Sequence, residues 1–368
     1  MQSFRTRMPP TDGHDDSLVR SLCRQQDNVI VRRDLPPPTP VEGEILIEVL
    51  FSGSNPSDLR IVNYLGFRNF VLGYDFCGRV LESPGLNGSG FKAGDIVAGY
   101  TSYEDDQPLR WGTHQSYISR PPIGMFKVPG NLPLPDAAAL TTVVQTANDA
   151  LFHLFKLPPP SSGQGHIEGT LVVWGGGTAV GMSAIQLAHA IGITSIITTA
   201  SASRHGLLQE LGATQCSDYH DESVVQQVKR AVQEAGNKRV WGFDTAGTPD
   251  SSRLLLDSLA GFEGEVQYAF VGLISGNRPA SEMCLAVRHH KLAFDIPGAP
   301  EPYVFPAKPA EAEIIWKATE WVVAHYGKEF RLPGLRVFAG RAEEALEQLQ
   351  TVAAQGAFGK LVLKQPLE

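Results

Sequence analysis

The sequence predicts an α/β protein in which a β-rich part precedes a doubly wound parallel sheet. Two observations predict this fold class: short strand-like runs between Gly, Pro and Asn clusters in the N-terminal part, and a regular alternation of strands and helices after residue 169. A third is the segment 157–169 (LPPPSSGQGHIEG), whose Pro, Ser and Gly content is typical of a loop or domain boundary. Because 368 residues exceed what one hydrophobic core usually holds, we expect two domains or one elaborated domain.

The β-rich part is predicted from its alternating and apolar runs. Residues 44–51 (EILIEVLF) alternate apolar and acidic residues, which predicts a strand with one face in water. Shorter strands are expected over 78–81, 96–100 and 117–119. The Ala-rich pattern of 135–155 then predicts helices.

The second part is predicted from its rhythm of buried strand and helix, which is typical of a parallel sheet covered on both faces. Its strands are expected over 170–174, 195–199, 239–243 and 265–271, and its helices over 180–191, 205–211 and 224–235. The C-terminal segment adds helices over 310–325 and 342–354 and strands over 335–338 and 360–363. The Pro-, Ser- and Gly-rich segment predicts that the parallel-sheet domain begins near residue 157.

The composition narrows the function classes. Lys and Arg total 31 against 39 Asp and Glu, a net charge of −8, whereas a nucleic-acid-binding protein normally carries a basic excess. No apolar run approaches the roughly 20 residues of a membrane helix, and no secretory signal is visible. The four cysteines are far apart in the sequence, which argues against a disulfide scaffold and for a reducing compartment. We expect a soluble, cytoplasmic protein with neither a nucleic-acid nor a membrane partner.

The sharpest local motif is LVVWGGGTAVG, residues 171–181. A buried strand runs into three glycines at 175–177, and a helix that contains Gly181 follows. Glycines let a backbone turn tightly and approach a pyrophosphate, to which a helix N-terminus presents free N–H groups. The strict G-x-G-x-x-G spacing is not met, because a Val stands in the place of the third glycine. A glycine-rich turn without a ligand is therefore the alternative, but a dinucleotide site is favoured.

The end of the second parallel strand indicates which dinucleotide binds. An NAD site usually places Asp or Glu there to bind the ribose 2′-hydroxyl, but no carboxylate precedes Glu210. Ser201, Ser203 and Arg204 stand there instead, and an Arg can hold a 2′-phosphate at two points. The alternative is a helix cap, with Ser203 at the N-cap position and Arg204 in solvent. The two interpretations are compatible, and NADPH is favoured.

Neither a metal site nor a hydrolytic site is indicated. The ten histidines and four cysteines show no H-E-x-x-H or C-x-x-C spacing, so no metal is predicted. His289 and His290 form an isolated pair that we expect in a solvated turn. No G-x-S-x-G motif marks a nucleophilic serine.

Three motifs precede the glycine loop in order: NPSD at 55–58, GYDFCG at 73–78 and GDIVAG at 94–99. With GKLV at 359–362, they make nearly the whole chain resemble the medium-chain dehydrogenase/reductase superfamily. The resemblance implies a GroES-like β-rich catalytic domain, formed by 1–156 together with 297–368, combined with a Rossmann domain over 157–296.

The resemblance also bears on metal content. Zinc-dependent members carry Cys where Asn55 stands, and Gly-His-Glu where this chain has Gly-Tyr-Asp at 73–75. They also carry a four-cysteine structural lobe that is missing here. The resemblance therefore implies a zinc-independent reductase.

Within the superfamily the chain is most similar to the fungal trans-acting enoyl reductases that serve polyketide synthases. The similarity lies in VWGGGT at 173–178, the Pro-rich insert before it, Thr146-Ala147 and the segment 270–272. It implies an NADPH-dependent reduction of an α,β-unsaturated acyl thioester in secondary metabolite biosynthesis. The partner would be the acyl carrier domain of a polyketide synthase.

The resemblance further implies which residues form the site. Thr146 would lie beside the nicotinamide, where its hydroxyl and nearby backbone N–H groups are the candidates to donate to the thioester oxygen. The alternative is that the Thr146 hydroxyl only bonds a backbone carbonyl of its own helix. Arg60, where relatives tend to carry Lys, would hold a phosphate or carbonyl without acting as a proton donor. For the proton of the α-carbon, Tyr64, Tyr74 and water all stay open. The cofactor-binding residues would be Asn55, Pro56, Ser57, Gly176, Gly177, Thr178, Ala179, Val180, Ser201, Ser203, Arg204, Tyr219, Thr245, Phe270, Val271, Gly272, Leu273 and Lys360.

Two other functions stay open. One is the reduction of free enones or quinones in the same fold. The loops 64–70 and 274–306 would decide between these substrates and a thioester, because they set the depth of the pocket. The other is a non-redox isomerase, cyclase or binding protein that retains the NADPH site, since fold alone does not determine chemistry. A carrier-borne substrate would call for a basic surface patch facing an acidic carrier protein. The candidates for that patch are Arg288, Lys291, Arg331 and Arg336.

Overall fold

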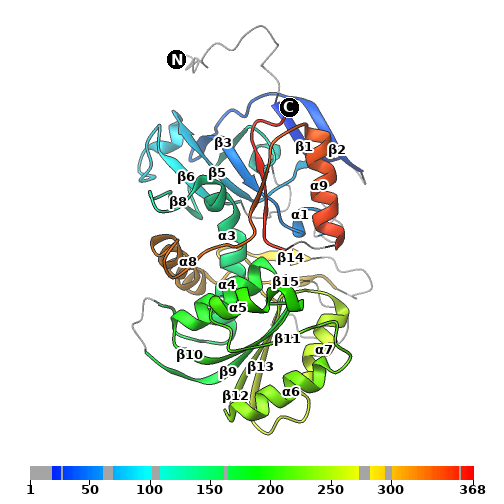
Figure 1. The fold of residues 1–368 in the computed structure, drawn as a ribbon. Coiled ribbons are helices and arrows are strands. Elements are labelled where there is room, and N and C mark those ends of the chain that lie inside the picture. Colours follow the sequence, from blue (N-terminus) through cyan, green and yellow to red (C-terminus); the bar gives the residue numbers. More distant parts are fainter. Residues whose placement is uncertain are drawn as a thin grey trace.

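The computed structural model describes residues 19–25, 28–60, 69–101, 108–160, 165–272, 282–294, 301–355 and 358–368. Figure 1 shows two halves: a β-rich half that holds both ends of the described chain, and a half built on a parallel sheet, drawn mostly in green. The predicted α/β fold class is confirmed. No helix within these ranges is both long and apolar enough to cross a membrane.

The largest sheet of the β-rich half runs in the order β16-β17-β3-β5-β6-β8, and β7 pairs with β3 off this path. Its strands are β3 (Ile45–Gly53), β5 (Asp75–Leu81), β6 (Ile96–Tyr100), β7 (Tyr117–Arg120), β8 (Met125–Lys127), β16 (Arg336–Phe338) and β17 (Leu361–Lys364). The strands predicted over 44–51, 78–81, 96–100 and 117–119 are all present. Strand β17 pairs with β3, so the C-terminal segment completes the sheet that the N-terminal segment begins.

Strand β3 keeps only part of the wet face that its alternation predicts, because Glu48 and Leu50 are half-buried and Leu46 of the same face is buried. Leu46 and Ile47 point to opposite faces of the sheet, yet both are buried. Helix α3 (Leu134–Asn148) packs so closely that a Cβ at Gly53 would lie 2.1 Å from the carbonyl oxygen of Ala138. The wet face is narrower than predicted because β3 is a central strand, and tertiary neighbours cover Glu44 and Leu46 while Glu48 stays partly exposed.

A second sheet, ordered β2-β1-β4, has no counterpart among the predicted strands. Its strands are β1 (Val19–Gln25), β2 (Asn28–Leu35) and β4 (Phe70–Val71). Leu22 and Phe70 of this sheet share a core cluster with Ala345 and Leu349 of helix α9 (Ala342–Gln355). The arginines interspersed in VRSLCRQ and NVIVRRDL obscure the apolar pattern by which strands are recognised.

The second half is a parallel sheet in the order β11-β10-β9-β12-β13. Its strands are β9 (Ile167–Trp174), β10 (Ile193–Thr199), β11 (Gln215–Ser217), β12 (Arg239–Asp244) and β13 (Glu265–Phe270). All four strands predicted for this half are present, and only the short β11 was not predicted. Strand β9, which leads into the glycine motif, lies at the centre of the sheet.

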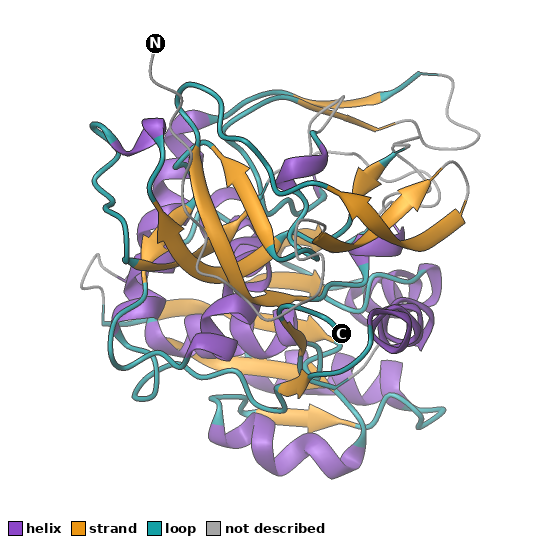
Figure 2. Ribbon diagram, turned by 90° about the horizontal axis from the view of Figure 1, so that it is seen from above, coloured by secondary structure: helices purple, strands orange, loops and turns teal. Residues whose placement is uncertain are grey.

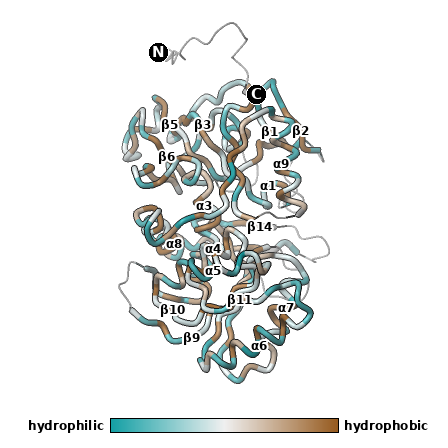
Figure 3. The backbone as a smooth tube through the Cα atoms, in the orientation of Figure 1, coloured by the Kyte–Doolittle hydropathy of each residue, from teal (hydrophilic) through white to brown (hydrophobic). Residues whose placement is uncertain are grey.

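Helices cover both faces of this sheet, as Figure 2 shows in a view from above. They are α4 (Ala179–Ala190), α5 (His205–Glu210), α6 (Val224–Ala235) and α7 (Pro249–Leu259). Leu171 and Val173 of β9 belong to the core cluster that includes α4, whereas Val172 and Trp174 pack with α6 and α7. Helix α6 is buried on one side only, and its tube alternates between hydrophobic and hydrophilic colours in Figure 3.

Helix α3 joins the two halves, because it contacts strand β5 on one side and helix α4 on the other. It continues directly into a π-helix, Asp149–Leu154, and helix α8 (Pro309–Ala324) packs against both. Strands β14 (Leu292–Phe294) and β15 (Tyr303–Phe305) form a hairpin near this junction. The boundary predicted between residues 296 and 297 falls between these two strands, outside the described residues, and stays a prediction.

Candidate active site

The glycine motif forms a tight turn between β9 and α4. Gly175 has a φ of +89°, a conformation that favours glycine. Its N–H donates to Thr199 Oγ1 at 3.1 Å, and the N–H of Gly176 donates to the Thr199 carbonyl oxygen at 2.9 Å. The turn is therefore fastened to the end of the neighbouring strand β10, where the second half of a dinucleotide site is expected.

The glycines of this turn differ in the space around them. A Cβ at Gly176 would lie 2.1 Å from Thr198 Oγ1, and one at Gly181 would lie 2.5 Å from the carbonyl oxygen of Gly175. A Cβ at Gly177 would meet nothing closer than Ala200, at 4.0 Å. Two glycines thus permit close packing inside the protein, while the third leaves open space at the turn. Such a cradle fits a pyrophosphate.

The N-terminus of α4 completes this cradle. Thr178 is its N-cap, and the Thr178 hydroxyl accepts the N–H of Gly181 at 2.9 Å. The first i→i−4 bond of the helix is donated by Met182 to Thr178, so the N–H groups of Ala179 and Val180 have no partner within the helix. Helix termini of this kind bind anions through such groups.

Thr245 supports the turn from behind and is buried. Its hydroxyl lies 2.9 Å and 2.8 Å from the carbonyl oxygens of Trp174 and Gly175. It also accepts the hydroxyl of Thr178 at 3.0 Å. Thr245 therefore contacts the glycine turn and the N-cap of α4, and its contact with a cofactor stays a prediction.

The residues predicted to bind the adenosine end lie together beyond β10. The Ser201 hydroxyl lies 3.5 Å from the Tyr219 hydroxyl, and the Tyr219 ring packs on His220 with centroids 4.0 Å apart. Ser203 is exposed and Arg204 is half-buried. The alternative that Ser203 caps a helix is wrong, because α5 begins after Arg204 and has no side-chain cap.

The residues predicted to line the nicotinamide follow β13. Phe270 is buried and its carbonyl oxygen accepts the N–H of Cys284 at 2.9 Å, while the N–H of Val271 donates to Asp244 at 2.9 Å. Gly272 has a φ of +111°. Leu273 lies outside the described residues. Phe270 is thus joined directly to the segment 282–294.

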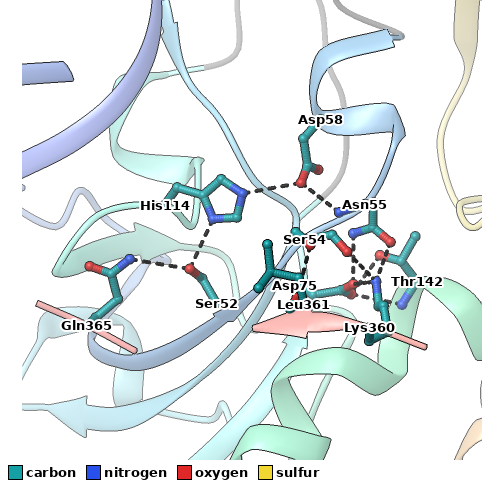
Figure 4. A network of polar contacts seen from close by, with 10 residues as sticks. All are labelled: Ser52, Ser54, Asn55, Asp58, Asp75, His114, Thr142, Lys360, Leu361 and Gln365. Atoms are coloured by element: carbon teal, nitrogen blue, oxygen red, sulfur yellow. Dashed lines mark hydrogen bonds and ion pairs between the residues drawn. The ribbon is translucent and has the colours of Figure 1, made fainter. Parts of the chain in front are cut away.

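A buried cluster of charges lies where α1 (Ser57–Arg60) begins (Figure 4). The Lys360 ammonium donates to the Ser54 carbonyl oxygen at 2.7 Å and to Asn55 Oδ1 at 2.6 Å, and it lies 3.4 Å from Asp75 Oδ2. Asn55 Nδ2 in turn donates to Asp75 Oδ2 at 2.9 Å. The side chains of Asn55 and Lys360, both predicted to bind cofactor, are here bound to one another and to Asp75. Ser57 follows in the same turn.

Asp75 also connects this cluster to α3. Its Oδ1 accepts the N–H of Thr142 at 2.8 Å and the Thr142 hydroxyl at 2.6 Å. One turn later the Thr146 hydroxyl donates to the carbonyl oxygen of Thr142 at 2.7 Å. Thr146 is half-buried, and its proton is used within the helix.

A second buried network adjoins the first and was not predicted. His114 lies between Asp58, with Nε2 at 3.2 Å from Oδ2, and Ser52, with Nδ1 at 3.0 Å from Oγ (Figure 4). The residue types are those of a Ser-His-Asp triad, but the two ring nitrogens are reversed, with Nδ1 facing the serine, and all three side chains are fully buried, so no substrate can reach the serine. Asp58 Oδ2 also accepts the N–H of Asn55 at 2.7 Å. The network therefore holds the turn that carries Asn55.

Arg60 lies at the end of α1 and is exposed. Its Nε donates to the carbonyl oxygen of Ala353 in α9 at 2.6 Å. Of the residues suggested as proton donors, Tyr74 is buried, whereas Tyr64 lies outside the described residues. The proton donor stays open.

Asp149, at the start of the π-helix, is the centre of a third buried cluster. Arg288 Nε and Nη2 donate to its two oxygens at 2.9 Å and 2.7 Å, and the N–H of Leu285 donates at 2.8 Å. His153 Nδ1 lies at 2.9 Å, and Lys308 Nζ lies 2.9 Å from His153 Nε2. Burial alone would raise the pKa of Asp149, but hydrogen bonds from His153 and Arg288 hold it below its ordinary value.

This cluster corrects one expectation about the surface. Arg288 is buried in its ion pair with Asp149 and cannot belong to a surface patch. Arg331 is exposed but pairs with Glu210 at 3.0 Å. Lys291 and Arg336 are exposed, and their role in binding a carrier protein stays a prediction.

The histidine pair is not a solvated turn. The His289 ring lies 6.4 Å from the Tyr100 ring, with Nδ1 3.5 Å from the Tyr100 hydroxyl. Trp316 of α8 covers Tyr100 at 6.5 Å between centroids. Burial, with smaller contributions from His290 and Arg120, lowers the pKa of His289 to about 4. The expectation failed because Tyr100, distant in sequence, packs against His289, and both histidines are half-buried.

Within the described ranges, no three His, Cys, Asp or Glu side chains lie close enough to hold a metal ion. The four cysteines, all described, are free thiols. Burial raises the pKa of Cys23 and of Cys77 to about 12, which makes both thiols poor nucleophiles. The cellular compartment and independence of zinc both stay predictions.

Comparisons with known proteins agree with this architecture. Residues 41–130 match a family described as the alcohol dehydrogenase GroES-like domain, and residues 179–294 match one described as zinc-binding dehydrogenase. Among solved structures, that of mycobacterial Rv1454c complexed with NADPH aligns with a TM-score of 0.67 and 19 % identity, covering 94 % of this chain and 99 % of that one. This likeness shows the fold.

Curated relatives include the trans-enoyl reductase himH of Aspergillus japonicus, 33 % identical over 56 % of this chain and 60 % of that protein. A zinc-type alcohol dehydrogenase-like protein of Schizosaccharomyces pombe is 31 % identical over 64 % of this chain and 67 % of its own length. The trans-enoyl reductase resD of Aspergillus sclerotiorum is 26 % identical over 90 % of this chain and 95 % of its length. Three curated relatives, himH among them, are matched over only 60 %, 61 % and 62 % of their own lengths, so the chain spans less than two thirds of each. With its GroES-like and Rossmann halves, the chain belongs to the medium-chain dehydrogenase/reductase superfamily.

Proposed function

We propose that the protein is an NADPH-dependent enoyl reductase that reduces the C=C bond of an α,β-unsaturated acyl thioester. It would act in trans on a chain borne by the acyl carrier domain of a polyketide synthase, in secondary metabolite biosynthesis. The observation that carries this proposal is the near full-length similarity to resD, a named trans-enoyl reductase, aligned over 350 residues. The open turn at Gly177 supports it, because a redox function needs a cofactor cradle.

The chain offers groups suited to each part of NADPH. The N–H groups of Ala179 and Val180 would bind the pyrophosphate above Gly177. Ser201, Ser203 and Arg204 would take the 2′-phosphate, with Tyr219 beside the adenosine. No carboxylate follows β10 before Glu210, so nothing there favours the 2′-hydroxyl of NADH.

The bound nicotinamide would supply the hydride for the β-carbon of the substrate. Negative charge then develops on the thioester oxygen, which is stabilised by donors already aimed at it. We assign that role to the Thr146 hydroxyl. In the structure this hydroxyl donates to Thr142, so that bond must be released before it can donate to a substrate. Arg60 would bind a phosphate or carbonyl group at the surface of the site.

Asn55 has a neutral amide side chain where zinc-dependent members carry a cysteine, which fits a reduction without metal. Asn55 and Asp75 are bound to Lys360, whose positive charge compensates the buried carboxylate. The proposal therefore includes independence of zinc, and a metal chelator should leave the activity unchanged.

The test measures NADPH oxidation by the purified protein with unsaturated acyl thioesters of increasing length, free enones and quinones, and NADH as the control cofactor. Turnover that is confined to thioesters and uses NADPH supports the proposal. Faster turnover of quinones or free enones would overturn it in favour of a detoxifying reductase. NADPH binding without oxidation, even with carrier-bound substrate, would favour a non-redox protein.

A pair of variants tests the assigned catalytic residue. Thr146→Val removes the hydroxyl at nearly constant volume and should lower kcat about 10²-fold, the usual effect of losing one oxyanion donor. Thr146→Ser keeps the hydroxyl and should retain most activity. Equal activity in both variants would mean that Thr146 serves only its helix.

A further inference from the structure

Arg204 is covered on one face by an aromatic ring from a distant part of the chain. Its guanidinium carbon lies 3.8 Å from the centroid of the Phe358 ring. Arg204 belongs to the short 3-10 helix Ala202–Arg204 that follows β10, whereas Phe358 precedes β17. This contact therefore joins the expected 2′-phosphate site of one half to the C-terminal segment of the other.

The Phe358 ring is held in place by two glycine turns. A Cβ at Gly334, where φ is +76°, would lie 2.5 Å from Phe358 Cε1, so the ring rests directly on the glycine backbone. A Cβ at Gly359, also with a φ of +76°, would lie 2.1 Å from the carbonyl oxygen of Gly334. Both positions require glycine, and together they fix the ring against the backbone.

The same C-terminal segment is fastened to the Rossmann half at a separate point. Gln186 of α4 donates from Nε2 to the carbonyl oxygen of Arg331 at 3.0 Å. Its Oε1 accepts the N–H of Arg331 at 3.0 Å. Because these two bonds hold the segment without any help from Phe358, changing the ring should not detach it.

Stacking leaves a guanidinium with its N–H groups directed outward in the plane of the group. The aromatic ring occupies a face, and the edge is the part that binds a phosphate at two points. A long Arg side chain loses rotamer freedom when it binds an anion, and a residue that orders it beforehand lowers that cost. Phe358 can therefore raise the affinity for a 2′-phosphate without touching it.

We propose that Phe358 is a specificity-determining residue for NADPH over NADH, acting by holding the Arg204 guanidinium ready for the 2′-phosphate. This inference rests on the proposed function, because it assumes that Arg204 meets that phosphate.

The test uses two probes that differ only in the phosphate, adenosine 2′,5′-bisphosphate and 5′-AMP, titrated against the full chain. Phe358→Leu removes the ring face but keeps an apolar side chain. It should weaken binding of the bisphosphate about three- to tenfold and leave 5′-AMP unchanged. Phe358→Tyr keeps the ring and should bind both probes as the unaltered protein does.

A matched control is Glu210→Gln, which removes the neighbouring contact with Arg331 but keeps the stack. It should leave both affinities unchanged. Thermal unfolding checks that each variant folds, and Phe358→Met is a second ring-free variant should Leu not be accommodated.

Three outcomes are distinguishable. A preference for the bisphosphate that falls in the ring-free variants and survives in Phe358→Tyr supports the inference. An unaltered preference in Phe358→Leu or Phe358→Met overturns it while leaving NADPH as the cofactor. If the unaltered protein binds both probes equally, the assignment of NADPH fails as well, and the inference fails with it.

Discussion

Asp149 and Arg288 form a buried two-point ion pair that joins the helix carrying Thr146 to the segment after the expected nicotinamide strand. Arg288 Nε and Nη2 contact the two carboxylate oxygens at 2.9 Å and 2.7 Å. Asp149 directly follows α3, and Cys284, near Arg288 in sequence, donates its N–H to Phe270. The pair thus sets the spacing between two sides of the candidate active site.

Replacing one partner of this pair should destabilise the fold strongly. Asp149→Asn leaves the Arg288 charge buried without compensation, so we expect the free energy of unfolding to fall by about 3–5 kcal/mol. Denaturant unfolding measures this. Arg253→Gln, which removes exposed pairs with Asp250 and Asp257, is the control and should change stability by less than about 1 kcal/mol. If both variants lost a similar free energy of unfolding, burial of the Asp149–Arg288 pair would not be what makes it stabilising.

The lowered pKa of Asp149 also predicts that the folded protein loses stability in acid. Its pKa is lowered in the folded state from the usual value of 3.8, so the unfolded chain binds more protons near that pH. The stabilisation is present above about pH 4 and is lost as the pH falls through the folded pKa. We expect the acid unfolding transition of Asp149→Asn to be shallower below pH 4 than that of the unaltered chain. Parallel transitions would show that other carboxylates control it.

His289 predicts a pH dependence in a milder range. Burial lowers its pKa from 6.5 to about 4, so between these values the unfolded chain binds the extra proton. Stability should therefore decrease by about 1–2 kcal/mol as the pH falls from 6.5 to 4.5, and His289→Asn should lack this decrease. Unfolding at a series of pH values measures the difference, and identical profiles would contradict the burial of the imidazole.

Two neighbouring glycines should respond differently to Ala. At Gly176 a Cβ collides with Thr198 Oγ1, so Gly176→Ala should cost about 1–3 kcal/mol of stability. At Gly177 a Cβ meets open space, so Gly177→Ala should fold normally and lose cofactor affinity, by about tenfold, because the methyl group occupies the cradle. Thermal unfolding and NADPH titration separate the two effects. Unchanged NADPH affinity in Gly177→Ala would place the cofactor elsewhere.

The pair of Lys360 and Asp75 should show strong coupling. Lys360→Met leaves a buried carboxylate and should cost about 3–5 kcal/mol, whereas Asp75→Asn with Lys360→Met should recover much of this loss. A double-mutant cycle in denaturant measures the coupling. If Lys360→Met weakens NADPH binding while stability is retained, Lys360 serves the cofactor instead.

Much of the architecture could be predicted because it depends on local patterns. The strands over 170–174 and 239–243 are continuous apolar runs, and such runs form buried parallel strands whatever their neighbours are. The turn that begins at Gly175 could be predicted from its glycines, because the φ of +89° at Gly175 favours glycine. Strand β1 was missed since its arginines mask its apolar face.

The site was harder to predict where its parts come from distant segments. Asp58 belongs to the NPSD motif, but nothing in the sequence links it to His114 or Ser52, and only the fold brings the three into one network. No sequence signal distinguishes Arg288, buried in an ion pair, from the exposed Lys291. A charged side chain is buried only where an oppositely charged partner compensates it, and the tertiary fold determines which partner lies beside it.

The sequence by itself determined the two-part α/β fold, the glycine turn after β9 and the Ser and Arg side chains after β10, because each depends on residues close together in the chain. The tertiary structure alone decided that Gly176 packs inward while Gly177 faces open space, and that Phe358 lies on Arg204. It also decided that Lys360 is held by Asp75. The physical reason is that burial and charge compensation arise between segments far apart in sequence, and no local pattern encodes them.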